Sequence, residues 1–290
     1  MPELPEVQTI VNDLQPLLVN KFIVRIKIID HRLKELAEAN NQLLIINQPI
    51  INLFRRAKNL VIQLANGYYL VAHLKMTGQL VWLNQQTWLA GGHPTKDLAD
   101  QALPHWPNKS TRLMFELSDG SQLFFNDTRK FGWLKLMNQQ QWTDYQQSLG
   151  LEPLEKTFLL TALESIIKQH PRSKIKPLLL NQHQIAGLGN IYVDESLFMA
   201  RIRPNRLAGK IKLLEIKKLH HSIIDVLTRA IASRGTSFSD YRDGQGQRGN
   251  FSRQLQVYGR GQQACFNCGG PLTKIKLAGR GTHFCPHCQK

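Results

Sequence analysis

Apolar residues are spaced differently in the two halves of the chain. A helix is predicted over residues 6–18, where apolar side chains recur every three or four positions, and Pro16 is expected to disturb its last turn. After residue 22 the period falls towards two, as in half-buried strands. The predicted strands are residues 22–30, 60–64, 68–74, 112–117, 122–126 and 133–137. Ala65-Asn66-Gly67 and Ser118-Asp119-Gly120 are typical hairpin turns. The first half is therefore predicted to be a β-sandwich preceded by a helix.

The second half has helical periodicity, so the fold class is α+β. Helices are predicted over residues 158–169, 175–180, 190–199 and 212–233. Residues 84–111 and 235–254 lack a clear period and are expected to be loops. We expect a β-sandwich domain with its leading helix over residues 1–137, a linker over 138–156, a helical domain over 157–254 and a C-terminal β-hairpin over 255–290.

All four cysteines lie near the end of the chain, in two Cys-x-x-Cys pairs. These are Cys265 with Cys268 and Cys285 with Cys288. The spacing suits one tetrahedral Zn²⁺, and four protein ligands leave no open position, so such a zinc is structural. Two disulfides or a redox pair are the alternatives, and the absence of a signal-like segment disfavours the disulfides. Residues 271–277 resemble a strand and 279–281 a tight turn, as expected for a hairpin stabilised by metal.

Charge is concentrated in the same half of the chain. The net charge is +16, yet residues 1–167 hold 16 Lys and Arg against 15 Asp and Glu, whereas residues 168–290 hold 21 against 6. Such an excess favours a polyanionic partner, above all nucleic acid. An anionic membrane would call for a basic amphipathic helix or a polybasic block, and the basic residues here are dispersed. No apolar run is long enough to span a membrane, so we expect a soluble, unexported protein.

Met1-Pro2-Glu3-Leu4-Pro5-Glu6 begins the chain with a potential nucleophile. Removal of Met1 leaves the secondary amine of Pro2, and an α-amino group has a pKa of about 7.7–8.0. Part of it is uncharged at neutral pH and able to attack an electrophilic carbon, with Glu3 nearby as an acid. The competing interpretation is that these residues merely begin a helix.

A second candidate ligand site is Gly187-Leu188-Gly189-Asn190, where one predicted helix ends and the next begins. Glycines permit close approach of a ligand, and the amides at a helix start favour phosphate. A packing joint between two helices is the alternative. Asp194 and Glu195, one turn into the second helix, either support this site or pair locally.

These motifs together resemble the bacterial formamidopyrimidine-DNA glycosylase family, in the family's order and nearly from end to end. The matching segments are PELPEV at 2–7, RRAKNL at 55–60, HLKMTG at 73–78, NDTRKFG at 126–132, IAGLGNIYVDESL at 185–197, VYGR at 257–260 and the cysteine pairs with Arg280. The resemblance implies a catalytic N-terminal β-sandwich with a leading helix, a DNA-binding helix–two-turn–helix domain with a lesion-capping loop, and a zinc hairpin. It also implies a cytoplasmic, nucleoid-associated bacterial monomer. Its implied partner is duplex DNA containing oxidised bases or abasic sites, and binding to a membrane is not expected.

The resemblance also assigns roles to individual residues. It implies a bifunctional glycosylase and AP lyase that excises oxidised purines, such as 8-oxoguanine and formamidopyrimidines, in base excision repair. Pro2 would form a Schiff base leading to β,δ-elimination, Glu3 would protonate the sugar, and the cofactor would be one structural Zn²⁺. Lys58 and Arg280 complete the implied catalytic set, and the resemblance implies that they bind phosphate together with Asn190 and Tyr258. His73 is implied to bind DNA, whereas Met76, Arg129 and Phe131 would fill the gap left by the flipped base. Residues 236–241 correspond to a loop that covers that base.

The chain departs from the family at Gln8, Thr128 and Asn250, and in the long segment 84–111. These differences bear on lesion range and opposite-base preference. Two other functions stay open: an endonuclease VIII-like enzyme for oxidised pyrimidines, which Leu4 disfavours, and a catalytically silent zinc protein that binds damaged DNA.

Overall fold

The chain folds into two compact units in a computed structural model that describes residues 1–92, 106–236 and 249–290. The first unit comprises residues 1–147 and 233–250, and the second comprises 148–232 and 251–290. No helix among the described residues is long and apolar enough to cross a membrane.

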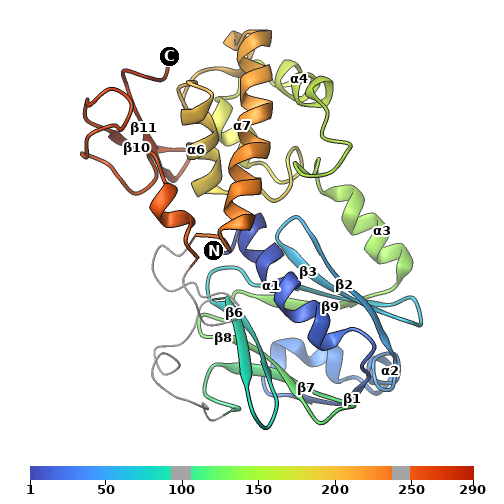
Figure 1. The fold of residues 1–290 in the computed structure, drawn as a ribbon. Helices are drawn as coiled ribbons and strands as arrows, with labels where there is room; N and C mark the ends of the chain where they lie inside the picture. Colours follow the sequence, from blue (N-terminus) through green and yellow to red (C-terminus); the bar gives the residue numbers. More distant parts are fainter. Residues whose placement is uncertain (93–105, 237–248) are drawn as a thin grey trace. The chain divides into compact units, whose positions relative to one another are not determined.

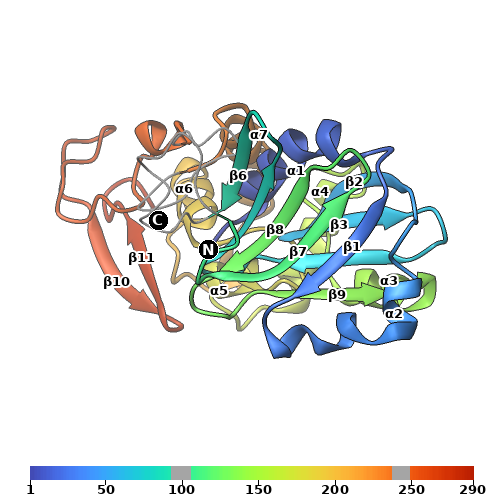
Figure 2. The same cartoon turned by 90° about the horizontal axis from the view of Figure 1, so that it is seen from below.

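The first unit contains two antiparallel sheets packed face to face with helix α1 (Leu4–Leu18) against them, which confirms the predicted β-sandwich (Figure 2). The five-stranded sheet has the order β1-β7-β8-β5-β6 and the four-stranded sheet the order β2-β3-β4-β9. The strands are β1 (Ile23–Ile28), β2 (Ile50–Arg56), β3 (Asn59–Leu64), β4 (Tyr69–His73), β5 (Gly78–Leu83), β6 (Trp88–Gly92), β7 (Thr111–Leu117), β8 (Gln122–Asp127) and β9 (Trp133–Met137). Short helices η1 (His31–Ala37) and α2 (Ala39–Leu43) follow β1, and α3 (Gln139–Ser148) follows β9.

The core of the first unit is built from the alternating apolar positions of both sheets and the apolar stripe of α1. Leu14 on α1, Leu60 on β3 and Phe115 on β7 are all at most 1% exposed. Both predicted hairpin turns are present, with Gly67 at φ +80° between β3 and β4 and Gly120 at φ +79° between β7 and β8. Helix α1 continues through Pro16 to Leu18, so the predicted disturbance does not end it.

Strand β6 corrects the expectation that residues 84–111 form only a loop. Residues 88–92 pair with β5, while residues 93–105 lie outside the described part of the chain. Gly91 gives the reason for the weak sequence signal, since a Cβ there would lie 2.5 Å from Cγ1 of Ile10 on α1. The strand therefore uses a residue of low β-propensity to allow close approach of the helix.

The second unit is helical, as predicted. Its helices are α4 (Leu160–Gln169), α5 (Ile175–Leu180), α6 (Asn190–Met199) and α7 (Leu213–Ala232), with the short η3 (Ala208–Lys210) and η4 (Phe251–Gln254). Strands β10 (Thr273–Leu277) and β11 (Arg280–Phe284) form the expected C-terminal hairpin, which packs on α6 (Figure 1). Its turn is Ala278-Gly279, both at positive φ, so Arg280 begins β11 rather than occupying the turn.

Candidate active site and zinc centre

The N-terminal residues are buried at the start of α1. Pro2 is buried and Glu3 is 4% exposed, whereas Met1 is 38% exposed. Glu3 is the N-cap, and its backbone N–H donates to Oε2 of Glu6 at 2.8 Å within a capping box. The helix start therefore fixes the backbone that carries both Pro2 and Glu3.

Glu6 also connects this helix start to a distant segment of the same unit. Its Oε1 accepts a hydrogen bond from the backbone N–H of Thr236 at 2.8 Å, and the side chain is 3% exposed. Gly235, at φ +80°, permits the approach, because a Cβ there would lie 2.9 Å from the same oxygen. Arg234 adds an ion pair with Asp13 on α1 at 2.6 Å. Of the predicted covering loop 236–241, residues 237–241 lie outside the described part of the chain.

Lys58 lies in the turn between β2 and β3 and is 5% exposed. The preceding residue, Ala57, has φ +56°, and its carbonyl accepts a hydrogen bond from Nη1 of Arg55 at 3.0 Å. Nε of the same arginine donates to Oε1 of Gln8 at 3.0 Å. Gln8, one of the positions that departs from the family pattern, therefore supports the Lys58 turn through Arg55.

His73 ends β4 and is half-buried. Burial, together with the nearby charges of Lys75 and Lys58, lowers the pKa of His73 to about 3. Its Nδ1 accepts the backbone N–H of Lys75 at 3.0 Å, which assigns the proton of the neutral ring to Nε2. His73 is thus an uncharged hydrogen-bond donor at neutral pH.

The three residues expected to fill a base gap are exposed on two turns. Met76 lies between β4 and β5 and is 42% exposed, whereas Phe131 lies between β8 and β9 and is 54% exposed. The Arg129 guanidinium lies over the Phe131 ring, 4.7 Å from its centroid. Large apolar side chains at such exposed positions have no role in the core of the unit.

In the second unit, two of the predicted phosphate-binding residues are brought together. Asn190 begins α6, and its Nδ2 donates to the carbonyl of Gly281 at 2.9 Å and lies 3.5 Å from the Tyr258 hydroxyl. Arg280, adjacent to Gly281, is exposed at the start of β11. The zinc hairpin thus presents Arg280 from the same strand that contacts Asn190.

Asp194 and Lys176 hold this hairpin against α6. Both are fully buried, and Lys176 Nζ lies 2.7 Å from Oδ1 of Asp194 and donates to the carbonyl of Gly281 at 3.0 Å. The other Asp194 oxygen accepts the backbone N–H of His283 at 2.9 Å. One ion pair therefore fixes both residues 281 and 283 of β11.

Glu195 fixes the segment that carries Tyr258. Its carboxylate accepts the backbone N–H groups of Gln256, Val257 and Tyr258 at 2.8, 3.0 and 2.8 Å. Burial raises the pKa of Glu195, and the three amide donors oppose that shift. Asp194 and Glu195 therefore contact the segments that carry Arg280 and Tyr258 and do not pair only within their own helix.

The four cysteines converge into one cluster in which all Sγ atoms lie within 4.8 Å of one another. The Cys265–Cys288 and Cys268–Cys285 sulfurs are 3.9 and 3.6 Å apart. Tetrahedral zinc with Zn–S bonds of about 2.3 Å requires sulfurs about 3.8 Å apart, so the cluster fits the ion. Burial and the neighbouring thiols raise the pKa of Cys288 to about 12. A bound dication offsets this by stabilising the thiolates, and the centre is a structural zinc site.

Three domain families match the chain in succession. They are the formamidopyrimidine-DNA glycosylase N-terminal domain over residues 1–134, its H2TH domain over 149–242 and the zinc finger found in FPG and IleRS over 263–290. Formamidopyrimidine-DNA glycosylases of Syntrophomonas wolfei and Streptococcus mutans are 40% and 39% identical to the chain, each over the full length of both proteins. The chain belongs to the formamidopyrimidine-DNA glycosylase family.

Solved structures of this family agree with the fold. A point mutant of Lactococcus lactis FPG, in complex with Fapy-dG containing DNA, has a TM-score of 0.85 and 33% identity over all of both chains. Lactococcus lactis Fpg with DNA containing an abasic site has a TM-score of 0.84, 33% identity and 99% coverage of each chain. Family membership identifies the chain as a DNA glycosylase of DNA repair.

Sequence reasoning did not assign several residues that organise this glycosylase site. Glu6, Lys176 and Asp127 each bind a group far away along the chain, respectively the Thr236 N–H, the Gly281 carbonyl and the Thr77 hydroxyl, so the neighbouring residues do not reveal these partners. A charged residue within an otherwise apolar helical stretch was the available signal for Lys176, in Ile175-Lys176-Pro177-Leu178.

Proposed function

We propose that this glycosylase excises oxidised purines from duplex DNA and then cleaves the strand as an AP lyase, with Pro2 as the nucleophile. The observation that carries the proposal is the buried Pro2-Glu3 pair, fixed by the capping box between Glu3 and Glu6. A glutamate that only began a helix could stay exposed to solvent. Glu3 is instead 4% exposed, directly beside Pro2.

The chemistry begins when Met1 is removed and the Pro2 amine is released. The amine attacks C1′ of the damaged nucleoside while Glu3 protonates the sugar ring oxygen, the base departs, and the ring-opened iminium forms. The iminium acidifies C2′, so a proton is lost there and the 3′-phosphate leaves. A second elimination releases the 5′-phosphate, and hydrolysis of the iminium by water restores the Pro2 amine.

The other candidate residues serve DNA binding in this proposal. Lys58, Asn190, Tyr258 and Arg280 bind backbone phosphates, and neutral His73 donates through Nε2. Complexes of Lactococcus lactis Fpg with N7-Benzyl-Fapy-dG containing DNA and with abasic-site DNA support duplex DNA of these kinds as the partner.

Borohydride trapping tests the proposal most directly. The processed chain is incubated with a duplex containing 8-oxoguanine opposite cytosine, reduced, and the cross-linked peptide is mapped by mass spectrometry. The matched control is a chain extended before Met1 so that Pro2 stays in peptide linkage. We expect an adduct on the Pro2 nitrogen of the processed chain and none in the extended one, with duplex binding retained in both.

Oxidised pyrimidines are the second candidate substrates, because a Lactococcus lactis Fpg complex contains an oxidised pyrimidine in DNA, with 33% identity and a TM-score of 0.83 to this chain. Trapping with a pyrimidine lesion alone would favour this range. Tight binding without an adduct on any lesion would instead identify a silent DNA-binding protein, and an adduct elsewhere than Pro2 would refute the assigned nucleophile.

A further inference from the structure

Two turns that carry the exposed residues Met76, Arg129 and Phe131 are connected below the surface of the first unit. Met76 belongs to the turn between β4 and β5, and the other two belong to the turn between β8 and β9. The connection runs through Thr77 and the buried Asp127, which is 1% exposed. The inference drawn from it rests on the proposed function, in which these three side chains fill the gap left by a flipped base.

Asp127 makes one hydrogen bond within its own turn and one to the neighbouring turn. Its Oδ2 accepts the backbone N–H of Gly132 at 2.6 Å, which closes the turn that contains Arg129 and Phe131. Its Oδ1 accepts the hydroxyl of Thr77, the residue after Met76. Thr77 Oγ1 in turn accepts the backbone N–H of Arg129 at 3.1 Å. The Thr77 hydroxyl therefore donates to Asp127 and accepts from Arg129, and so links the turn after β4 to the turn after β8.

Gly132 and Arg112 keep Asp127 in place. A Cβ at Gly132 would lie 3.0 Å from Oδ2 of Asp127, so a residue without a side chain allows the short contact. Arg112 donates through Nε to the Asp127 carbonyl at 2.8 Å. Hydrogen bonds thus fix both the backbone carbonyl and the side-chain carboxylate of Asp127.

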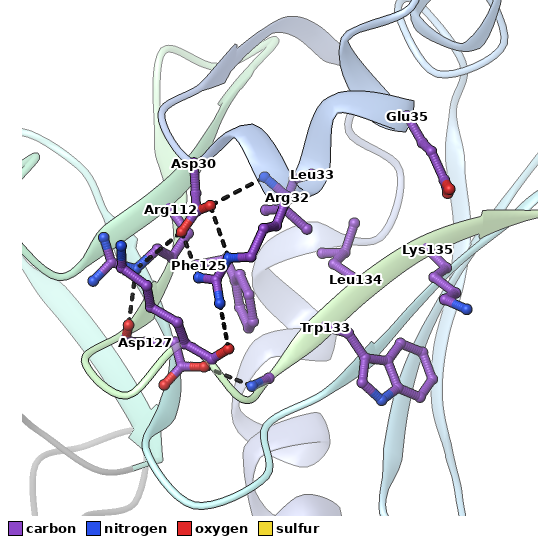
Figure 3. A pocket seen from close by; sticks show the side chains of 12 residues that line it. Asp30, Arg32, Leu33, Glu35, Arg112, Phe125, Asp127, Trp133, Leu134 and Lys135 are labelled. Atoms are coloured by element: carbon purple, nitrogen blue, oxygen red, sulfur yellow. Dashed lines mark hydrogen bonds and ion pairs between the residues drawn. The ribbon is translucent and has the colours of Figure 1, made fainter.

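Arg32 restrains the same turn from the other side. Its Nη1 donates to the carbonyl of Lys130 at 2.7 Å, and Lys130 has φ +59°, a conformation that a lysine rarely adopts. Oδ2 of Asp30 lies 2.6 Å from Nη2 of Arg32 and 3.7 Å from Nε of Arg112 (Figure 3). The middle residue of the turn is therefore held by a side chain from η1.

We propose that Asp127 and Thr77 are positioning residues that fix the two turns relative to each other, so that Met76, Arg129 and Phe131 enter the base gap as one preformed unit. Three exposed side chains on independent turns would each lose conformational freedom when they enter the duplex. Turns that are already connected lose less, and they set the distance between the two apolar side chains and the Arg129 guanidinium, whose planar fork of donors suits pairing with the base opposite the gap.

The test compares Thr77→Val, which removes the hydroxyl, with Thr77→Ser, which keeps it. Thr143→Val is the matched control, because it also removes a hydrogen-bonding hydroxyl, in this case one that donates to a backbone carbonyl on α3 of the same unit. Single-turnover excision of 8-oxoguanine is measured opposite cytosine and opposite adenine. Trapping of a single-stranded abasic oligonucleotide is measured in parallel, since it has no opposite base and reports the Pro2 chemistry alone.

We expect Thr77→Val to slow excision from duplex DNA by on the order of 10- to 100-fold, as misplacement of positioned groups does. It should also change the ratio of the excision rates opposite cytosine and opposite adenine, while single-stranded trapping is unchanged. Thr77→Ser and Thr143→Val should behave as the wild type. If Thr77→Val does not fold, Arg32→Met removes the hydrogen bond to Lys130 and should produce the same difference between duplex and single-stranded substrates.

Two results would overturn the inference while leaving the proposed function intact: wild-type behaviour of Thr77→Val on duplex DNA, or an equal loss on duplex and single-stranded substrates, which would indicate a purely structural bond. Failure of the proposed function has a different signature. In that case the wild-type chain itself gives no Pro2 adduct with any substrate.

Discussion

The buried ion pair between Lys176 and Asp194 predicts a large effect of a single substitution and a small effect of a double one. Both side chains are fully buried, with 2.7 Å between Nζ and Oδ1. In Lys176→Met the Asp194 carboxylate loses its cation and keeps the N–H of His283 as a donor. An uncompensated buried charge costs about 3–5 kcal/mol. Asp194→Asn leaves the lysine charge buried instead, with a cost of the same order.

The double variant Lys176→Met/Asp194→Asn removes both charges and keeps an amide oxygen for the N–H of His283. Replacing a whole buried pair is often neutral or stabilising. What is lost is the hydrogen bond from Lys176 to the Gly281 carbonyl, at 3.0 Å, worth about 1.5–3 kcal/mol because its donor is charged. The double variant should therefore be more stable than either single variant.

Hydrogen exchange of the hairpin peptide 273–284 is the appropriate assay, because it reports local opening of β10 and β11 rather than unfolding of the whole chain. A loss of about 3–5 kcal/mol in local stability corresponds to roughly two to three and a half orders of magnitude faster exchange through opening. Zinc release to a chelator should accelerate in the same order of variants. If the two single effects simply add in the double variant, the pair is not coupled and the reasoning is refuted.

Three further predictions concern charge and metal. His73, with a pKa lowered to about 3, should show no titration of its ring resonances between about pH 8 and pH 5, and a midpoint near the ordinary value of about 6.5 would contradict this. The unfolded chain binds this proton more readily than the folded chain, so the contribution of neutral His73 to stability should decline as the pH falls from about 6.5 towards 3. Acid unfolding of the wild type and of His73→Gln, monitored by circular dichroism, measures this decline. Cys268→Ser removes one of the four zinc ligands, so it should lower the zinc content, measured colorimetrically, and weaken duplex binding by the hairpin that carries Arg280. An unchanged affinity for duplex DNA would show that binding does not depend on this hairpin and Arg280.

Features set by neighbouring residues could be predicted from the sequence. The hairpin turns at Gly67 and Gly120 depend on a positive φ at each glycine. Helix α6 begins at Asn190, directly after the Gly187-Leu188-Gly189 segment. The cysteine pairs likewise have a spacing that suits one metal before any fold is known. These local rules also explain why the two structural classes, sandwich and helical, were distinguishable.

Features set by contacts between distant residues could not. Strand β6 depends on α1, because its Gly91 is explained only by the proximity of Ile10. Residues 138–156 were expected to be a linker, whereas residues 139–148 form helix α3. The helix buries only Trp142, so its sequence carries no apolar stripe that would predict it. The positions of Asp194 and Glu195 on a helix say nothing about partners 61 to 89 residues away.

The departure at Gln8 shows how a change in sequence can leave the geometry of a site intact. A glutamate there would form an ion pair with Arg55, whereas Gln8 accepts the same Nε donor through a neutral oxygen at 3.0 Å. The arginine still donates to the carbonyl of Ala57, whose φ of +56° defines the turn before Lys58. What changes is the charge around Lys58, since a nearby carboxylate would reduce the attraction of that lysine for phosphate. In the proposed function, where Lys58 binds phosphate, this difference would affect the strength of DNA binding, while the placement of Lys58 depends on a hydrogen bond that both residues can accept.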